Sequence, residues 1–193
     1  MRTNLHLAVL AIAVAAMGLS SSARADEMTA FQLVKKGNEY VGPDVRDQVV
    51  QIRSEKSVGG MFPTIWYIVY YDPDAAFRAT EVKFGGGKKL EVKRPTRMIE
   101  FTNKDKDPLD RKKLNVDSDK ALAIAEKDPL LDKLTLKASE MKLERSDEGP
   151  VWKIRLWAAK LRNPNDDANL GEVWVLADDG RVMKRDLHPD HVD

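Results

Sequence analysis

The fold of this chain is indicated most clearly by residues 149–186, GPVWKIRLWAAKLRNPNDDANLGEVWVLADDGRVMKRD. Apolar and charged residues alternate from Val151 to Trp157, which is typical of a β-strand with one buried face and one solvated face. A second apolar run, Glu172 to Ala177, leads into Asp178-Asp179-Gly180, a turn of the Asp-Gly type found in β-hairpins. The stretch therefore predicts a small antiparallel sheet that ends in a short strand, Arg181 to Lys184.

A helix and a further strand are predicted just before this sheet. Asp117 or Ser118 can cap a helix whose apolar residues form one stripe, and Asp128-Pro129 ends it. Between Leu134 and Leu143 the apolar residues change parity, so we expect a β-bulge near Ser139-Glu140, because one extra residue shifts the register.

Residues 63–93 contain a weaker version of the same pattern. Ile65 to Tyr71 is β-branched and aromatic on both faces, as in a central strand. The strand Ala79 to Phe84 follows, and Gly85-Gly86-Gly87 turns the chain into Leu90 to Lys93. Upstream, residues 28–41 suit a short amphipathic helix and residues 45–53 a strand. The chain thus reads as one module used twice.

We predict the α+β class, with two tandem repeats that each consist of a helix and a three- or four-stranded antiparallel sheet. The predicted divisions are a first repeat at 26–95, a linker at 96–116, a second repeat at 117–187 and a frayed polar tail at 188–193. The linker carries an expected short strand around Met98, Ile99 and Phe101.

The N-terminal 25 residues have the pattern of a secretory signal peptide. Arg2 precedes an uncharged stretch, and Ala23-Arg24-Ala25 offers small residues where a signal peptidase reads, so cleavage is expected after Ala25. The apolar stretch, Leu7 to Ala23, is at the short limit for a membrane anchor. We therefore expect a periplasmic or secreted bacterial protein without a stable membrane anchor. No cysteine occurs in the chain, which excludes disulfides and a lipid-modified cysteine.

The second half resembles a PepSY domain. The resemblance rests on the helix at residues 117–125, the strand Trp152 to Leu156 and the closing hairpin Val173 to Val182, whereas Gly85-Gly86-Gly87 in the first half replaces the usual acidic turn. Tandem copies would be similar to the PepSY-like fold shared with the β-lactamase inhibitor protein. The resemblance implies a non-catalytic extracytoplasmic module that binds or inhibits other proteins, and it implies no catalytic residues.

The residues offer little catalytic chemistry. Outside the leader the only histidines are His188 and His191, and with Asp190 they are weak candidates for metal ligands, because a metal site needs three or four ligands in a rigid frame. No serine lies in a nucleophile elbow. Gly85-Gly86-Gly87 precedes a strand and not a helix, so it is a hairpin and not a phosphate cradle. We expect no cofactor, no metal and no enzymatic activity.

Charge and aromatic residues indicate the kind of partner. Loss of Arg2 and Arg24 with the leader takes the formal net charge from +1 to −1, so we expect no binding to nucleic acid. Residues 83–113 carry a local excess of Lys and Arg, which is more typical of a solvated surface than of a site for an anionic partner. Most aromatic side chains are expected in the core. The candidates for exposure and for contact with a protein partner are Tyr67, Tyr71, Lys153, Arg155, Trp157 and Trp174.

From these observations we expect a non-catalytic exported protein that binds or inhibits another protein in the cell envelope. The alternative is a small-ligand or metal-binding periplasmic protein that uses a pocket beneath the helices or the tail from His188 to His191. An enzyme would require a pocket with paired buried carboxylates.

Overall fold

The computed structural model describes residues 28–95 and 108–193. The predicted leader with its cleavage after Ala25 and the short strand expected around Ile99 lie outside the described residues. In the part of the chain that the structure describes, no helix is long and apolar enough to cross a membrane.

The described residues form one eight-stranded antiparallel sheet with the strand order β4-β3-β2-β1-β5-β6-β7-β8. The α+β class is therefore confirmed, and the strands of both halves belong to a single sheet. The strands are β1 (Val49–Ser54), β2 (Ile65–Tyr71), β3 (Ala79–Gly85), β4 (Lys88–Lys93), β5 (Leu136–Ser146), β6 (Gly149–Ala159), β7 (Asp167–Leu176) and β8 (Val182–Leu187).

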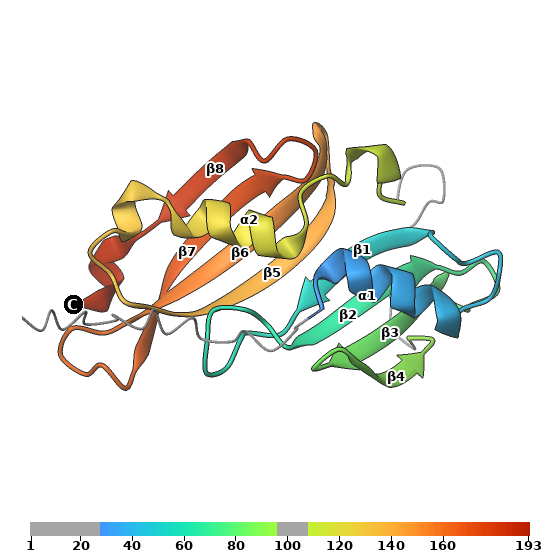
Figure 1. Cartoon of the computed structure of the whole chain (residues 1–193), viewed down its shortest axis with the longest axis horizontal. Helices are drawn as coiled ribbons and strands as arrows, with labels where there is room; N and C mark the ends of the chain where they lie inside the picture. Colours follow the sequence, from blue (N-terminus) through green and yellow to red (C-terminus); the bar gives the residue numbers. More distant parts are fainter. Residues whose placement is uncertain (1–27, 96–107) are drawn as a thin grey trace, which may run out of the picture.

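Two α-helices lie on the same face of this sheet (Figure 1). They are α1 (Ala30–Gly37), next to β1 to β3, and α2 (Ser118–Glu126), next to β5 to β8. Short 3-10 helices are η1 (Asn38–Tyr40), η2 (Arg111–Lys113), η3 (Pro129–Leu131) and η4 (Pro189–Val192). The helices begin close to the predicted starts, because Thr29 and Asp117 occupy the N-cap positions.

Strands β5 and β7 contain bulges that the sequence did not locate correctly. The expected bulge near Ser139-Glu140 is wrong: the register shifts between Leu136 and Ala138, so that Ala138 pairs with Trp157. Strand β7 begins at Asp167, before the predicted start at Glu172. Between Leu156 and Trp157 the pairing with β7 shifts, and Gly171 adopts a φ of 105° there, which interrupts the apolar alternation.

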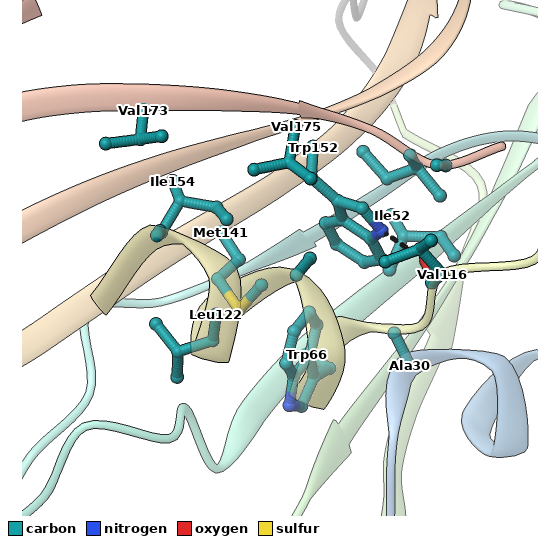
Figure 2. Packing of buried hydrophobic residues seen from close by; sticks show 14 of the residues in the cluster. Ala30, Ile52, Trp66, Val116, Leu122, Met141, Trp152, Ile154, Val173 and Val175 are labelled. Carbon is teal, nitrogen blue, oxygen red and sulfur yellow. Dashed lines mark hydrogen bonds between the residues drawn. The ribbon is translucent and has the colours of Figure 1, made fainter. Parts of the chain in front are cut away.

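The main core is a continuous apolar cluster between the sheet and both helices. At its centre Trp66 of β2 and Trp152 of β6 meet edge to face, with ring centroids 6.4 Å apart and an angle of 82° (Figure 2). The Trp152 indole donates a hydrogen bond to the carbonyl oxygen of Val116 at 2.9 Å, and the Trp66 indole donates to that of Pro63 at 2.8 Å. Both large rings can therefore be buried without an unsatisfied N–H group.

The two helices meet at their N-termini. The Oγ of Ser118 accepts a hydrogen bond from the backbone N–H of Ala30 at 3.0 Å. The Oδ1 of Asp117 accepts from the N–H of Phe31 at 3.1 Å and also from the N–H of Ser118 at 2.7 Å. One carboxylate thus stabilises the positive ends of two helix dipoles, one in each half of the chain.

The central strands β1 and β5 join the halves through a short ladder, in which Ile52 is opposite Leu143 and Arg53 is opposite Lys142. Where that ladder ends, Ser57 and Ser139 exchange hydrogen bonds, from Ser57 N to Ser139 O at 2.8 Å and from Ser139 N to Ser57 Oγ at 2.9 Å. These contacts extend the junction beyond the paired strands.

The expectation of a frayed tail is wrong. Residues Pro189 to Val192 form η4, and the Val192 side chain is buried in the main core. The carbonyl oxygen of Val192 accepts a hydrogen bond from Leu161 N at 2.8 Å, and His188 N donates to Leu170 O at 2.7 Å. The predicted polar tail contains one apolar residue, and this residue attaches it to the sheet.

Candidate interaction surface

The face of the sheet opposite α1 and α2 carries the charged and aromatic side chains of alternate strand positions. We call it the helix-free face, because in the described parts of the chain, 28–95 and 108–193, no α-helix covers it. On β6, Trp152, Ile154 and Leu156 belong to the helix-covered core, whereas Lys153 and Arg155 point to the helix-free face. This division confirms the predicted alternation of the strand.

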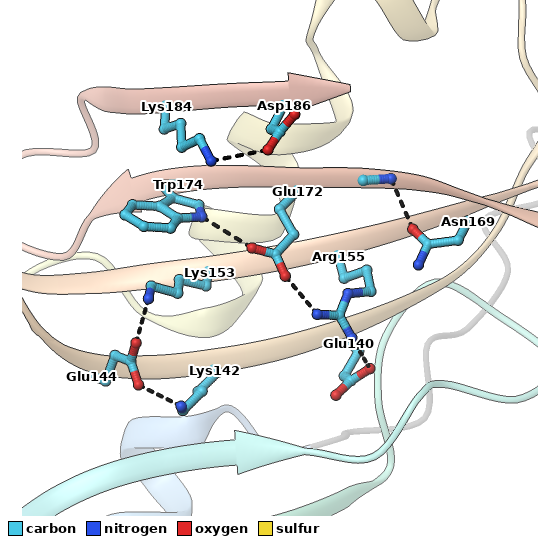
Figure 3. Close-up of polar contacts among 11 residues, drawn as sticks. Glu140, Lys142, Glu144, Lys153, Arg155, Asn169, Glu172, Trp174, Lys184 and Asp186 are labelled. Carbon is cyan, nitrogen blue, oxygen red and sulfur yellow. Dashed lines mark hydrogen bonds and ion pairs between the residues drawn. The ribbon is translucent and has the colours of Figure 1, made fainter. Parts of the chain in front are cut away.

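Trp174 lies on the half of this face that β5 to β8 form, next to Lys153, Glu172 and Lys184 (Figure 3). The Nζ of Lys153 lies 4.2 Å from the centroid of its ring, and that of Lys184 lies 5.1 Å from it. The indole N–H donates to Glu172 Oε2 at 3.2 Å, and the other oxygen of Glu172 accepts from Arg155 at 2.7 Å. The half-buried ring is therefore held in place from its own strand, β7, and from the neighbouring strands β6 and β8.

Two more half-buried aromatic rings of this face have cations nearby. The Nζ of Lys56 lies 4.6 Å from the ring centroid of Trp157. Tyr67 has Arg53 at 4.1 Å and Lys83 at 4.9 Å from its ring centroid. The Tyr67 hydroxyl donates to Glu55, and this hydrogen bond, with that from Lys83, lowers the pKa of the Glu55 carboxyl. Each ring keeps a partly exposed surface in a fixed position.

Acidic and basic side chains alternate around these rings. On β5 to β8 the face carries four acids, Glu140, Glu144, Glu172 and Asp186, and four bases, Lys142, Lys153, Arg155 and Lys184 (Figure 3). Because these charges balance, the surface suits a partner with both signs of charge better than a polyanion.

Glu144 illustrates how strongly these charges are coupled. Burial alone would raise the pKa of its carboxyl, but ion pairs with Lys142 and Lys153 outweigh burial, so the pKa is lowered. The pKa of Glu172 is lowered in the same way, with burial opposed by hydrogen bonds from Trp174 and Arg155. Glu144 and Glu172 therefore stay ionised well below neutral pH.

The structure divides the predicted contact residues into two groups. Tyr67, Lys153, Arg155, Trp157 and Trp174 all lie on the helix-free face. The expectation of exposure is wrong for one residue. Tyr71 is 6% exposed and packs with three apolar side chains in a second, smaller cluster. These neighbours are Val50, Val69 and Ala79. Tyr71 thus contributes to stability and offers little surface.

The described buried carboxylates do not form a pair with each other. Instead each makes an ion pair with a basic side chain: Asp72 with Arg94 at 3.2 Å, Asp128 with Arg185 at 2.6 Å, and Glu81 with Arg53. Such pairing offsets the cost of burying a charge.

A pocket of about 270 Å³ lies beside α1, between this helix, β1 and residues 109–114. Its lining is largely apolar and includes Phe31, Ile52 and Leu109. Two charged residues of its lining, Arg111 and Asp47, make an ion pair with each other at 2.8 Å. This is the pocket to which the alternative of a small ligand applies.

Sequence reasoning missed the cations that cover the rings. Lys56, Lys83 and Lys184 come from a loop and from strands other than those of the rings. The alternation of each strand could have placed Lys83 and Lys184 on this face, but their distance to a ring depends on strand register. Neither a protein-family model nor a curated protein nor a solved structure matches the chain, so the surface must be interpreted from its own chemistry.

Proposed function

We propose that this chain is an exported, non-catalytic protein of the bacterial cell envelope that binds another protein through the helix-free face of its sheet. The observation that carries the proposal is the set of three half-buried aromatic rings on that face, Tyr67, Trp157 and Trp174, each with a cation against it. Tyrosine, tryptophan and arginine are the residues that contribute most often to the binding energy of protein interfaces.

The arrangement of these rings favours binding over simple solvation. Each ring is held by neighbouring charges, so little side-chain entropy would be lost when a partner covers it. The surrounding ion pairs can form a polar rim, which is the usual composition of a non-obligate interface. A face of this kind suits a folded protein with an apolar patch and charges of both signs.

We also propose that the chain arose from two copies of one PepSY-like unit. The order of one helix followed by four strands occurs twice, and the strand order is symmetric about the pair β1 and β5. Trp66 and Trp152 come from corresponding strands, β2 and β6, and contact each other at the centre of the core. The unit in the second half retains the PepSY-like Asp178-Asp179-Gly180 turn.

The proposed location rests on the leader. Leu7 to Ala23 is apolar and uncharged, and Ala23-Arg24-Ala25 suits a signal peptidase. N-terminal sequencing of the protein from a periplasmic extract tests this point. The expected first residue is Asp26, and a chain that keeps Met1 would contradict export by this route.

The interaction can be tested by comparing two faces of the same protein. Immobilised protein is exposed to envelope extract beside a Trp157→Ala/Trp174→Ala variant and a control, Asp119→Ala/Lys120→Ala, which alters exposed residues of α2 on the opposite side of the sheet. A specific partner should bind the wild type and the control. Its affinity for the face variant should fall by at least about 30-fold, because two interface tryptophans are removed.

Thermal unfolding of each variant shows whether the fold survives the substitutions. Lys184→Glu provides a second variant, because it reverses one exposed charge beside Trp174 without removing a ring. If no protein binds, or if a partner binds the face variants as well as the wild type, protein binding through the helix-free face is refuted.

A further inference from the structure

The end of β8 and the following 3-10 helix bring three possible metal ligands together. One nitrogen of His188, one nitrogen of His191 and one carboxylate oxygen of Asp190 all lie within 4.8 Å of one another. The two imidazole rings are stacked, with centroids 5.0 Å apart and an angle of 15° between their planes. All three side chains are exposed, so an ion can reach them from solvent.

Each imidazole uses its other nitrogen for a contact that fixes the ring. His191 Nδ1 lies 2.9 Å from the carbonyl oxygen of Asn169. A carbonyl oxygen only accepts hydrogen bonds, so Nδ1 carries the proton and the neutral ring leaves Nε2 free. His188 Nε2 lies 3.3 Å from Asp186 Oδ1, an acceptor when ionised, which leaves Nδ1 free.

These two contacts are of the kind that accompanies metal-binding histidines. In metal sites, the histidine nitrogen that does not bind the ion usually donates to a carboxylate or to a backbone carbonyl. Here Asp186 supplies the carboxylate for one ring, and Asn169 supplies the carbonyl for the other. The nitrogens that remain for an ion are Nδ1 of His188 and Nε2 of His191.

The backbone around the cluster is held firmly. The buried Val192 attaches η4 to the core, and His188 N donates to Leu170 O at 2.7 Å. At Gly171 the strands β7 and β8 approach so closely that a Cβ atom would lie 1.9 Å from the carbonyl oxygen of Asp186. The strands that carry Asp186 and Asn169 are thus packed against each other next to the histidines. The cluster is therefore not on a frayed end.

We propose that His188, Asp190 and His191 form a binding site for a divalent transition-metal ion, with zinc as the best fit. Two imidazoles and a carboxylate suit Zn²⁺, Cu²⁺ and Ni²⁺, whereas Ca²⁺ and Mg²⁺ prefer oxygen ligands alone. In a tetrahedral zinc site with bonds of about 2.0–2.2 Å, two ligand atoms lie roughly 3.4 Å apart. The ligand atoms here lie within 4.8 Å of one another, so these exposed side chains need to move closer by no more than about 1.4 Å.

With three protein ligands, a tetrahedral ion keeps its fourth position for water or for a group of another molecule. This site does not depend on the proposed protein-binding function, because its ligands are the N-cap residue of η4 and two residues of η4, and not the rings of the helix-free face. Its failure would leave that proposal unchanged.

The test is calorimetric titration of the untagged protein with ZnCl₂ at pH 7.5, in a His6→Ala background in which His188 and His191 are the only remaining histidines. We expect one zinc ion per chain. The variant His188→Ala/His191→Ala should lose at least about 100-fold in affinity, since loss of a single supporting group outside the ligands already costs about 10–100-fold.

Two further variants separate a built site from a chance pair of histidines. Asp186→Asn keeps all three ligands but weakens the support of His188, so affinity should fall by about 10-fold. Asp193→Asn changes an exposed neighbour outside the cluster and should leave affinity unchanged.

Proton NMR of the histidine rings gives a readout that does not depend on heat. The ring signals of His188 and His191 should shift together as one equivalent of zinc is added. Because both rings are exposed, the metal-free double variant should unfold at the same temperature as its background. If zinc is not taken up one to one, or if the double variant binds it as well as the background does, the proposal is refuted.

Discussion

Replacement of Asp117 by alanine removes a contact that serves both helices at once. Its Oδ1 accepts hydrogen bonds from the N–H groups of Ser118 and Phe31, the first at the start of α2 and the second at the start of α1. Because Asp117 and Phe31 are 86 positions apart, the carboxylate also links the two halves of the chain. We expect Asp117→Ala to weaken both helix ends and their contact.

The size of the effect follows from these two hydrogen bonds. Loss of an N-cap aspartate costs about 1 kcal/mol of unfolding free energy, and up to about 2 in favourable cases. The second hydrogen bond, to a charged acceptor that is half-buried, adds about 1.5 kcal/mol, the low end of the range for such bonds. The sum, about 2.5 kcal/mol, corresponds to a fall in Tm of roughly 5–10 °C for a domain of this size.

Urea unfolding followed by tryptophan fluorescence measures this cost, because Trp66 and Trp152 lie in the core between both helices and the sheet. The matched control is Asp110→Ala. Asp110 caps the short helix η2 through one N–H group, that of Lys112, at an exposed position, so its loss should cost only about 0.5–1 kcal/mol.

Asp117→Asn provides a second comparison. The asparagine side chain keeps an oxygen acceptor but lacks the charge that faces two helix dipoles. The substitution should therefore lower the free energy of unfolding by about 1 kcal/mol, and this loss should be smaller in high salt. The reasoning is refuted if Asp117→Ala costs no more than Asp110→Ala, or if Asp117→Asn is as damaging as the alanine variant.

Two other predictions follow from the geometry. A Cβ atom on Gly37 would lie 2.2 Å from the Tyr70 hydroxyl oxygen, so Gly37→Ala should destabilise the protein although alanine favours helices by about 1 kcal/mol. In a Tyr70→Phe background, where the nearest ring carbon is 3.3 Å away, the same change should be neutral or stabilising, and equal costs in both backgrounds would contradict the clash. Ion pairs with Lys142 and Lys153 lower the pKa of Glu144, so its carboxylate contributes stability above its unfolded pKa of about 4.3, and this contribution is lost as pH falls through the lower folded pKa. The cost of Glu144→Gln in urea unfolding should therefore shrink between pH 7 and pH 3, and a cost that is independent of pH would show that the ion pairs do not stabilise the fold.

Local patterns were sufficient to predict most of the elements. The run of β-branched and aromatic residues from Ile65 to Tyr71 matches β2 from end to end, because such residues favour a central strand and Asp72-Pro73 ends it. Alternation in β6 placed Trp152 in the core and Trp157 on the opposite face. Positions that depend on bulges were misplaced, since the shifts at Leu136 and near Gly171 are decided by the partner strand.

The candidate site was only partly visible in the sequence. Alternation put Lys153, Arg155 and Trp174 on one surface, but Tyr71 has the same kind of side chain as Tyr67 and is buried. Its burial results from neighbours on two other strands, which no local pattern reveals. The tail was misread for a similar reason, because the burial of Val192 depends on the position of the core and not on the polar residues beside it.

What the sequence by itself determined is the order of elements, the faces of each strand and the caps of the helices, since these follow from periods of two or 3.6 residues and from local hydrogen bonds. Only the tertiary structure decided that both halves share one sheet, that Asp117 serves two helices and that lysines from other strands cover Trp174. Those features join residues far apart in the chain, so they depend on strand register and on packing, for which the sequence carries no local signal.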